Sequence, residues 1–194
     1  MCEAIINKIK QLKKEHNAVI LAHNYVASEL QDIADVLGDS LQLSIEASKL
    51  GAPVIVFCGV SFMAETAKIL SPNSKVLLPV KTAGCPMADM ATGEAVAEFR
   101  RTHPDYVLVA YVNSTAAVKA EVDICCTSAN AEKIVASIPR DKKIMFLPDR
   151  NLGRNVAKAL NREMEIWPGY CPIHNAITVA DVEAIKQENP GMEF

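Results

Sequence analysis

The chain has 194 residues, of which half are hydrophobic and 22% are charged, so it can fold as one large domain or two small ones. The formal net charge of −3 and the lack of a long basic stripe argue against nucleic acid as a partner. No apolar run approaches the roughly 20 residues that span a bilayer, and the N-terminus does not resemble a secretory signal, so we expect a cytoplasmic protein with no membrane partner.

The first 84 residues read as one unit in which helices alternate with buried strands. Apolar residues at helical spacing predict the first helix, and the continuous apolar run Val19–Ala22 predicts a strand buried on both faces. Pro53 opens a second strand, and Ser71-Pro72 ends the last helix. The expected helices span 4–15, 29–35, 41–50 and 62–70, and the expected strands span 19–22, 54–58 and 76–78.

A second unit, 85–170, repeats this order, and a third unit begins after it. In the second unit the expected helices span 93–101, 130–137 and 151–160, and the expected strands span 106–110, 143–147 and 165–167. Residues 171–194 match the opening of the second unit, with a helix expected at 178–187 and Asn189-Pro190 in the place of His103-Pro104. We interpret the chain as an incomplete product of a longer gene. The alternative is a natural two-unit protein closed by a capping helix.

Polar residues recur at a fixed spacing in the two units. Three pairs are 88 residues apart: His23 and Tyr111, Tyr25 and Asn113, Ser40 and Ser128. Self-similarity at a long fixed period indicates a duplicated architecture. Alternating strands and helices indicate parallel sheets, so each unit is expected to be a three-layer α/β/α unit. Ligands of such sheets bind outside the carboxyl ends of the strands, so His23, Tyr25, Tyr111 and Asn113 are expected to line one cleft between the units.

Two of the six cysteines lie in matched Cys-Pro turns. Cys85 and Cys171 each lie in a glycine-containing turn, precede a proline, and stand seven residues before a threonine. The pattern suggests one chemical device presented twice, although two ordinary turn cysteines would look the same. The chain has no C-x-x-C pair, which argues against a zinc ribbon and a thioredoxin-type site. We expect Cys58 in the core and a structural role for the adjacent Cys125 and Cys126.

Seven stretches, taken together, carry a resemblance to a known family. They are Ala22-His23-Asn24-Tyr25, Gly38-Asp39-Ser40, Gly84-Cys85-Pro86, Ala110-Tyr111-Val112-Asn113-Ser114, Cys125-Cys126-Thr127-Ser128-Ala129-Asn130, Pro148-Asp149-Arg150-Asn151-Leu152-Gly153 and Trp167-Pro168-Gly169-Tyr170-Cys171-Pro172-Ile173-His174. In this order they cover the chain from end to end, which makes the set far more specific than any one motif. The chain resembles the quinolinate synthases, the A protein of bacterial NAD biosynthesis.

The resemblance implies a fold and a reaction. Members of this family have three similar α/β/α domains around a pseudo-threefold axis. Each domain gives one cysteine to a [4Fe–4S] cluster, and one iron is left open to the substrate. The family condenses iminoaspartate with dihydroxyacetone phosphate to quinolinate, a transferase-type reaction that releases phosphate and water. The L-aspartate oxidase that supplies iminoaspartate is the protein partner that the resemblance suggests.

The resemblance also implies roles for individual residues. Cys85 and Cys171 resemble cluster ligands, and Tyr25 and His174 resemble acid–base residues near the open iron. The substrate-binding positions would be His23, Ser40, Tyr111, Val112, Asn113 and Ser128. The sequence lacks most of the third domain, with its cysteine and a His-Pro-Glu motif. We therefore expect that the chain alone neither holds a stable cluster nor makes quinolinate.

These residue types suit the chemistry on physical grounds as well. Cysteine thiolates are the usual ligands of iron–sulfur clusters, and an open iron can act as a Lewis acid. Histidine and tyrosine exchange protons, and polar groups at helix N-termini fit carboxylates and phosphates. Simpler interpretations stay open: Ser40 and Ser128 as N-caps, His23 as a strand-end histidine, and the tyrosines as packing residues. The alternative function is a non-catalytic two-domain α/β protein that binds a phosphorylated metabolite or a metal.

Overall fold

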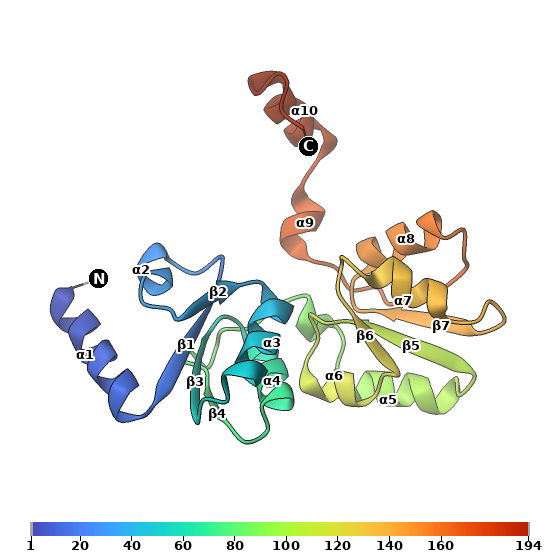
Figure 1. Ribbon diagram of the computed structural model, residues 1–194. Helices are drawn as coiled ribbons and strands as arrows, with labels where there is room; N and C mark the ends of the chain where they lie inside the picture. Colours follow the sequence, from blue (N-terminus) through green and yellow to red (C-terminus); the bar gives the residue numbers. More distant parts are fainter. Residues whose placement is uncertain (1, 194) are drawn as a thin grey trace.

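The computed structural model describes residues 2–193 and contains two α/β units joined side by side (Figure 1). Each unit has a four-stranded parallel sheet, with strand order β2-β1-β3-β4 in the first and β6-β5-β7-β8 in the second. The identical order confirms that the second unit repeats the first. The predicted fold class, repeated α/β units with parallel sheets, is therefore confirmed for these two units.

The elements of the first unit lie close to their predicted positions. They are α1 Glu3–Glu15, β1 Ala18–His23, α2 Ser28–Gln31, β2 Val36–Gly38, α3 Ser40–Leu50, β3 Val54–Cys58, α4 Ser61–Leu70 and β4 Lys75–Leu77. Two differences stand out. The short strand β2 was not predicted, and α2 ends at Gln31, earlier than expected. The chain after α2 is needed to enter β2, which pairs with the end of β1.

Most helices and strands of the second unit and the C-terminal segment also lie close to their predicted positions. The elements are η1 Ala88–Met90, α5 Gly93–Thr102, β5 Tyr106–Tyr111, α6 Ala116–Ala120, β6 Ile124–Cys126, α7 Ala131–Ser137, β7 Lys143–Leu147, α8 Arg150–Ala159, β8 Glu165–Ile166, α9 Pro172–Ala176 and α10 Val179–Glu188. The short elements η1, α6, β6 and α9 lie outside the predicted ranges. Helices α9 and α10 project away from both units (Figure 1). The predicted role of this segment as the start of a third unit stays a prediction.

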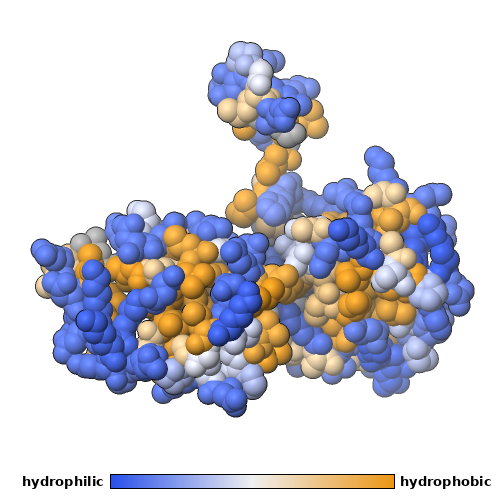
Figure 2. Space-filling view, viewed as in Figure 1, coloured by the Kyte–Doolittle hydropathy of each residue, from blue (hydrophilic) through white to orange (hydrophobic). Residues whose placement is uncertain are grey.

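The cores explain why these strands are so apolar. In β1 the three residues Ile20, Leu21 and Ala22 are buried, and Leu21 belongs to a core cluster that includes residues of α3 and α4. In the second unit two separate clusters lie around Phe146 and Leu108, as expected for a parallel sheet covered on both faces. Figure 2 shows hydrophobic residues gathered over the middle of each unit and along the stem that leads to α10.

The cysteines outside the Cys-Pro turns differ from one another. Cys58 was predicted to lie in the core, but it is half-buried and lies at the carboxyl end of β3. The preceding Phe57 fills the core, and successive strand residues point to opposite faces. For the same reason Cys126 is buried in the second core while Cys125 is exposed. Burial raises the pKa of Cys126 to about 12, which fits a structural thiol.

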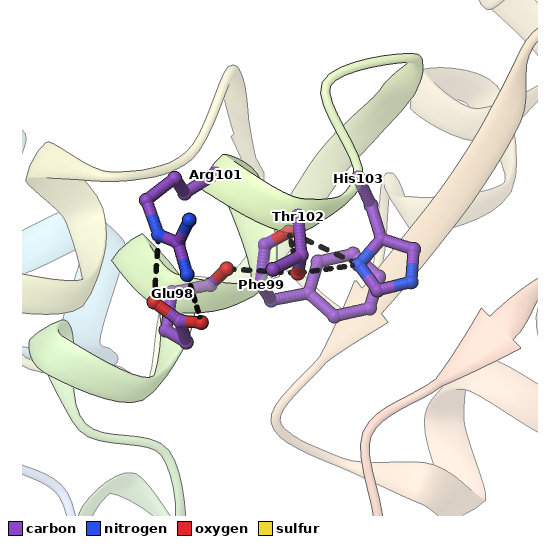
Figure 3. Close-up of polar contacts among 5 residues, drawn as sticks. All are labelled: Glu98, Phe99, Arg101, Thr102 and His103. Carbon is purple, nitrogen blue, oxygen red and sulfur yellow. Dashed lines mark hydrogen bonds and ion pairs between the residues drawn. The ribbon is translucent and has the colours of Figure 1, made fainter.

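Side-chain contacts mark the end of α5 (Figure 3). The Thr102 hydroxyl donates to the carbonyl oxygens of Glu98 and Phe99 at 2.9 and 3.1 Å. The ring of His103 stacks on that of Phe99 with centroids 4.2 Å apart, and Arg101 pairs with Glu98 at 2.6 Å. The predicted stop at His103-Pro104 is thus confirmed. Asn189 ends α10 in a similar way, by donating its side-chain amide to Ile185.

An aspartate anchors the first strand of each unit. Asp35 Oδ2 accepts from the backbone N–H of Ile20 at 2.7 Å, and its other oxygen pairs with Lys13 at 2.7 Å. Asp123 Oδ2 accepts from Leu108 N–H at 2.8 Å and pairs with Arg100 at 3.0 Å. The two aspartates are 88 residues apart, so the repeat extends to hydrogen bonds that the sequence did not indicate.

We predict that Asp35→Ala lowers the free energy of unfolding by about 1–2 kcal/mol, because it leaves the Ile20 amide without its carboxylate acceptor. Lys13→Ala, the control, removes only the ion pair and should cost about 0.5 kcal/mol or less. Urea denaturation followed by circular dichroism measures both. Equal losses for the two variants would contradict the prediction.

The two units are joined by α4 and α6. Glu65 Oε2 accepts from the backbone N–H of Ala116 at 2.7 Å, which helps to cap α6. Lys119 Nζ donates to Thr66 Oγ1 at 2.7 Å and lies 5.5 Å from the centre of the Phe62 ring. Burial lowers the pKa of Lys119 to about 8. The division at 84/85 stays a prediction, but these contacts bind the two units to each other.

The lowered pKa of Lys119 predicts a pH effect on stability. Between pH 8 and 10.5 the unfolded chain holds a proton on this amine that the folded chain has released, so stability rises with pH in this window. Lys119→Met should remove that contribution. The free energy of unfolding of the original protein should therefore rise relative to that of the Lys119→Met variant between about pH 7.5 and about pH 9.5. Lys158→Met, at an exposed position of α8, is the control and should run parallel to the original protein.

None of the helices in the described part of the chain is both long and apolar enough to cross a membrane.

Candidate functional site

A cavity of about 480 Å³ lies between the two units, with α3 on one side and the carboxyl edge of the second sheet on the other. Its wall includes five of the predicted substrate-binding residues: Ser40, Tyr111, Val112, Asn113 and Ser128. The strand ends of the second unit and a helix start of the first unit thus face one space. His23 and Tyr25 are not part of its wall, so the predicted cleft gathers only part of the expected set.

Ser40 and Ser128 are not the N-caps of their helices. Asp39 caps α3, since its Oδ1 accepts from the N–H groups of Leu41 and Gln42 at 3.0 and 2.8 Å. The cap position of α7 belongs to Asn130. The capping interpretation of the two serines is therefore wrong, because Ser40 is the first residue of α3 and Ser128 stands two residues before the cap of α7. Both residues border the cavity instead.

Tyr111 is the central residue of the second unit's contribution. It ends β5, where it pairs with Cys126, and its carbonyl accepts from the buried Ser114 hydroxyl at 2.9 Å. Burial, followed by the charge of Asp149, raises the pKa of Tyr111, and a hydrogen bond with Ser128 partly opposes that rise. The phenol is therefore protonated at neutral pH and can act as a hydrogen-bond donor.

His23 and Tyr25 form a pair at the end of β1. Their ring centres are 4.0 Å apart, and the backbone N–H of Tyr25 donates to His23 Nδ1 at 3.3 Å. Burial lowers the pKa of His23, with the charge of Asp39 acting in the opposite direction. Burial also raises the pKa of Tyr25, and Cys85 adds to this effect. Both side chains are therefore neutral at pH 7.

The charge of Cys85 contributes to the raised pKa of both Tyr25 and Tyr111, which come from different units. Cys85 therefore lies near both residues. A similar closeness links the two Cys-Pro turns through Met90, five residues after Cys85. The carbonyl of Met90 accepts from Trp167 Nε1 at 2.9 Å, and its sulfur accepts from the Tyr170 N–H at 3.3 Å. Both cysteines are half-buried and free, and their shared role as ligands stays a prediction.

His174 stands apart from the residues described so far. It lies on α9, is exposed, and belongs to the segment that leaves the body of the protein (Figure 1). The hydrogen bond from Asn175 N–H to the Cys171 carbonyl, at 2.9 Å, holds α9 directly on the second Cys-Pro turn. His174 is thus tied to the Cys171 turn, and the structure does not place it in the cavity.

Comparison with known proteins identifies the family. The family described as "Quinolinate synthetase A protein" matches residues 7–194. The chain belongs to this family. It is 58% identical to the quinolinate synthase of Pelobacter propionicus over 195 aligned residues, which is 100% of this chain and 64% of the relative. It is 56% identical to the quinolinate synthase of Geobacter metallireducens, and the alignment covers 99% of this chain and 63% of the relative. It is 54% identical to that of Dehalococcoides mccartyi strain CBDB1, and the alignment covers 97% of this chain and 62% of the relative.

The chain spans about 63% of the length of these quinolinate synthases. The family resemblance seen in the seven sequence stretches is confirmed. The two α/β units place five of the positions that the resemblance assigned to substrate around one cavity. No three His, Cys, Asp or Glu side chains of residues 2–193 are grouped so as to hold a metal ion. The metal-ligand roles of Cys85 and Cys171 are not tested by this.

Sequence reasoning missed two acidic residues at this site. Asp39 caps α3, and its charge partly opposes the lowering of the His23 pKa by burial. Asp149 is buried, caps α8 through Asn151 and Leu152, and raises the pKa of Tyr111. An aspartate directly before a helical pattern is a known start signal, so both caps could have been found. Their electrostatic effect on the site needed the fold.

Proposed function

We propose that this chain forms the substrate-binding part of a quinolinate synthase, which condenses iminoaspartate with dihydroxyacetone phosphate and releases phosphate and water. The observation that carries the proposal is the cavity between the units, lined by Ser40, Tyr111, Val112, Asn113 and Ser128. These are the positions that the family resemblance assigned to substrate. The proposal includes a cytoplasmic setting and a supply of iminoaspartate by an L-aspartate oxidase.

The cavity suits small anionic substrates. The N-terminal end of α3, with Ser40 at its first position, borders the cavity, and Lys49 adds a positive charge to the same wall. The Asp39 carboxylate already accepts from the N–H groups of Leu41 and Gln42 at this helix end. Tyr111, Asn113 and Ser128 offer a phenol, an amide and a hydroxyl on the opposite wall. Such groups can donate hydrogen bonds to carboxylate or phosphate oxygens. A ligand that touches both walls would also hold the two units together.

His23 and Tyr25 are proposed to accept and donate protons beside this cavity. Because His23 Nδ1 accepts from the Tyr25 N–H, the neutral ring carries its proton on Nε2. A histidine that is neutral at pH 7 can accept a proton, and a protonated tyrosine can donate one. Tyr25 is proposed as the donor, together with His174 once α9 is brought to the substrate. The lowered pKa of His23 and the raised pKa of Tyr25 support this division.

Cys85 and Cys171 fit two of the ligands of a [4Fe–4S] cluster. Both are free thiols at half-buried positions, and their turns meet at Met90. Thiolates are the normal ligands of such clusters. When bound, the cluster would supply an open iron that acts as a Lewis acid. The residues of this chain would bind and orient the substrate next to it and keep water from the reacting groups.

Titration of the protein with quinolinate, followed by calorimetry, tests the proposed substrate cavity. The double variant Ser40→Ala/Ser128→Ala should bind about tenfold more weakly, since it loses hydrogen bonds to a charged ligand. Ser48→Ala is the matched control on α3, because the Ser48 hydroxyl donates only to Ile45 and borders no part of the cavity. Equal affinities for the double variant and the control would overturn the proposed cavity.

Anaerobic reconstitution with iron and sulfide tests the chemistry separately. The chain is supplied with the remainder of the family's length, since we expect no turnover from the chain alone. Quinolinate formation from iminoaspartate and dihydroxyacetone phosphate that is lost in Cys85→Ser and Cys171→Ser supports the full proposal. Binding of dihydroxyacetone phosphate without turnover, by protein supplied with the remainder of the family's length, would favour the non-catalytic alternative instead.

A further inference from the structure

Arg150 contacts the chain on both sides of the Cys171–His174 segment. It is the first residue of α8, and its backbone N–H donates to the carbonyl of Gly169 at 2.8 Å. Its guanidinium lies over the ring of Tyr170, 4.4 Å from the ring centre. The same group donates through Nη2 to Asn175 Oδ1 at 3.3 Å. Tyr170 directly precedes Cys171, and Asn175 directly follows His174.

The contacts of the Arg150 guanidinium are made with Tyr170 and Asn175. Within residues 2–193 no carboxylate forms an ion pair with it. Its Nε is buried without a hydrogen-bond partner, so the side chain tolerates a polar cost to hold this position. Asn151 strengthens the arrangement, since its side-chain amide also reaches Asn175 Oδ1, at 3.4 Å. The aromatic face and the Asn175 amide oxygen are therefore the groups that hold the guanidinium.

We infer that Arg150 is a positioning residue, which fixes the segment from Cys171 to His174 against the second unit. This rests on the proposed roles of Cys171 and His174, which must be presented together to act on one substrate. An arginine suits the task because its planar guanidinium can stack on a ring and donate from its edge at the same time. A lysine has no plane to stack and would hold only one of the two sides.

Hydrogen exchange of the protein without cofactor tests the inference directly. The N–H groups of Asn175 and Ile177 donate to the carbonyls of Cys171 and His174. Their exchange rates therefore report how often these backbone hydrogen bonds of α9 open. We expect about tenfold faster exchange in Arg150→Ala, from the loss of the ring contact and one charged hydrogen bond. Arg150→Lys should recover little of the protection. Arg154→Ala, an exposed arginine one turn along α8, is the matched control and should exchange as the original protein does.

Alkylation of the individual cysteines, resolved by mass spectrometry, separates positioning from general stability. A positioning role predicts that Arg150→Ala speeds alkylation of Cys171 while the buried Cys126 keeps its rate. Faster alkylation of both would mean general loosening and would overturn the inference, as would unchanged exchange at Asn175 and Ile177. If Arg150→Ala does not fold, Asn175→Ala carries the test, because this exposed residue can lose its side chain without harming the core.

The outcome is independent of the proposed function. Changed exchange and selective alkylation in a protein that cannot be made to form quinolinate would support the positioning role of Arg150 and count against the proposed activity. Quinolinate formation by Arg150→Ala at the original turnover number, with unchanged exchange, would support the activity and overturn the positioning role. If turnover is seen, the positioning role predicts a lower kcat in Arg150→Ala with little change in KM, since the substrate cavity does not include α8 or α9.

Discussion

Arg162→Ala should lower the free energy of unfolding by about 3–4 kcal/mol, through the loss of hydrogen bonds from a charged group to backbone carbonyls. Arg162 is buried and donates to four carbonyl oxygens, those of Val135, Ile138, Pro139 and Lys142, at 2.6 to 3.1 Å. These oxygens belong to the end of α7 and the loop that leads to β7. Without the guanidinium these oxygens would lose their donors at buried and half-buried positions.

The neighbouring Arg140 provides a matched control. It is exposed and donates to the carbonyls of Asn161 and Leu160, each at 3.2 Å. Arg140→Ala should cost about 0.5 kcal/mol or less, because water replaces the lost donor. Arg162→Lys should recover only part of the loss, since an ammonium cannot reach four carbonyls in the fork geometry. Urea denaturation measures all three variants, and a loss below about 1 kcal/mol for Arg162→Ala would contradict the argument.

The sequence predicted the parts of the fold that are set by local pattern. The run Val19–Ala22 could be read as a buried strand because parallel strands covered on both faces are apolar throughout. The 88-residue repeat then placed Tyr111 at the same strand end as His23, and the identical strand orders confirm this. The cavity could be anticipated for the same reason, since strand ends of a parallel sheet meet at one edge.

The elements that sequence reasoning missed are short and depend on partners. β2 has three residues and α6 has five, too few to show a period. β2 exists because it pairs with the end of β1. α6 is capped by its own Thr115 and also by Glu65, 51 residues earlier, which accepts from the N–H of Ala116. The pairing of β2 with β1 and the contact with Glu65 leave no trace in the local sequence.

The candidate site was predicted in residue type better than in placement. Ser40 borders the cavity, but the neighbouring Asp39 caps the helix. His23 and Tyr25 were expected in the cleft, yet they form a separate pair beside the Cys85 turn. A spacing rule gives the end of the strand at which a side chain stands. It does not give the direction in which the side chain points.

Gly169→Ala should lower the free energy of unfolding by about 2–3 kcal/mol, because the turn before Cys171 has no room for a side chain. A Cβ at this position would lie 2.5 Å from the Pro148 carbonyl oxygen and 3.2 Å from Met90 Cβ. The first contact involves backbone that is fixed, since the Gly169 carbonyl accepts from Arg150 N–H at 2.8 Å on the same edge. The turn would have to move as a whole.

Gly84, the glycine of the other Cys-Pro turn, is the matched control. A Cβ there would come no closer than 3.6 Å to Asp89, so Gly84→Ala should change stability by about 0.5 kcal/mol or less. The single tryptophan makes the difference visible, because Trp167 is anchored to the Met90 carbonyl two residues before Gly169. Gly169→Ala should shift its emission to longer wavelength as this contact opens, and Gly84→Ala should not. An unshifted spectrum together with unchanged stability in Gly169→Ala would mean that the second Cys-Pro turn is not packed against Met90 and β7, and the proposed meeting of the two thiol turns would lose its basis.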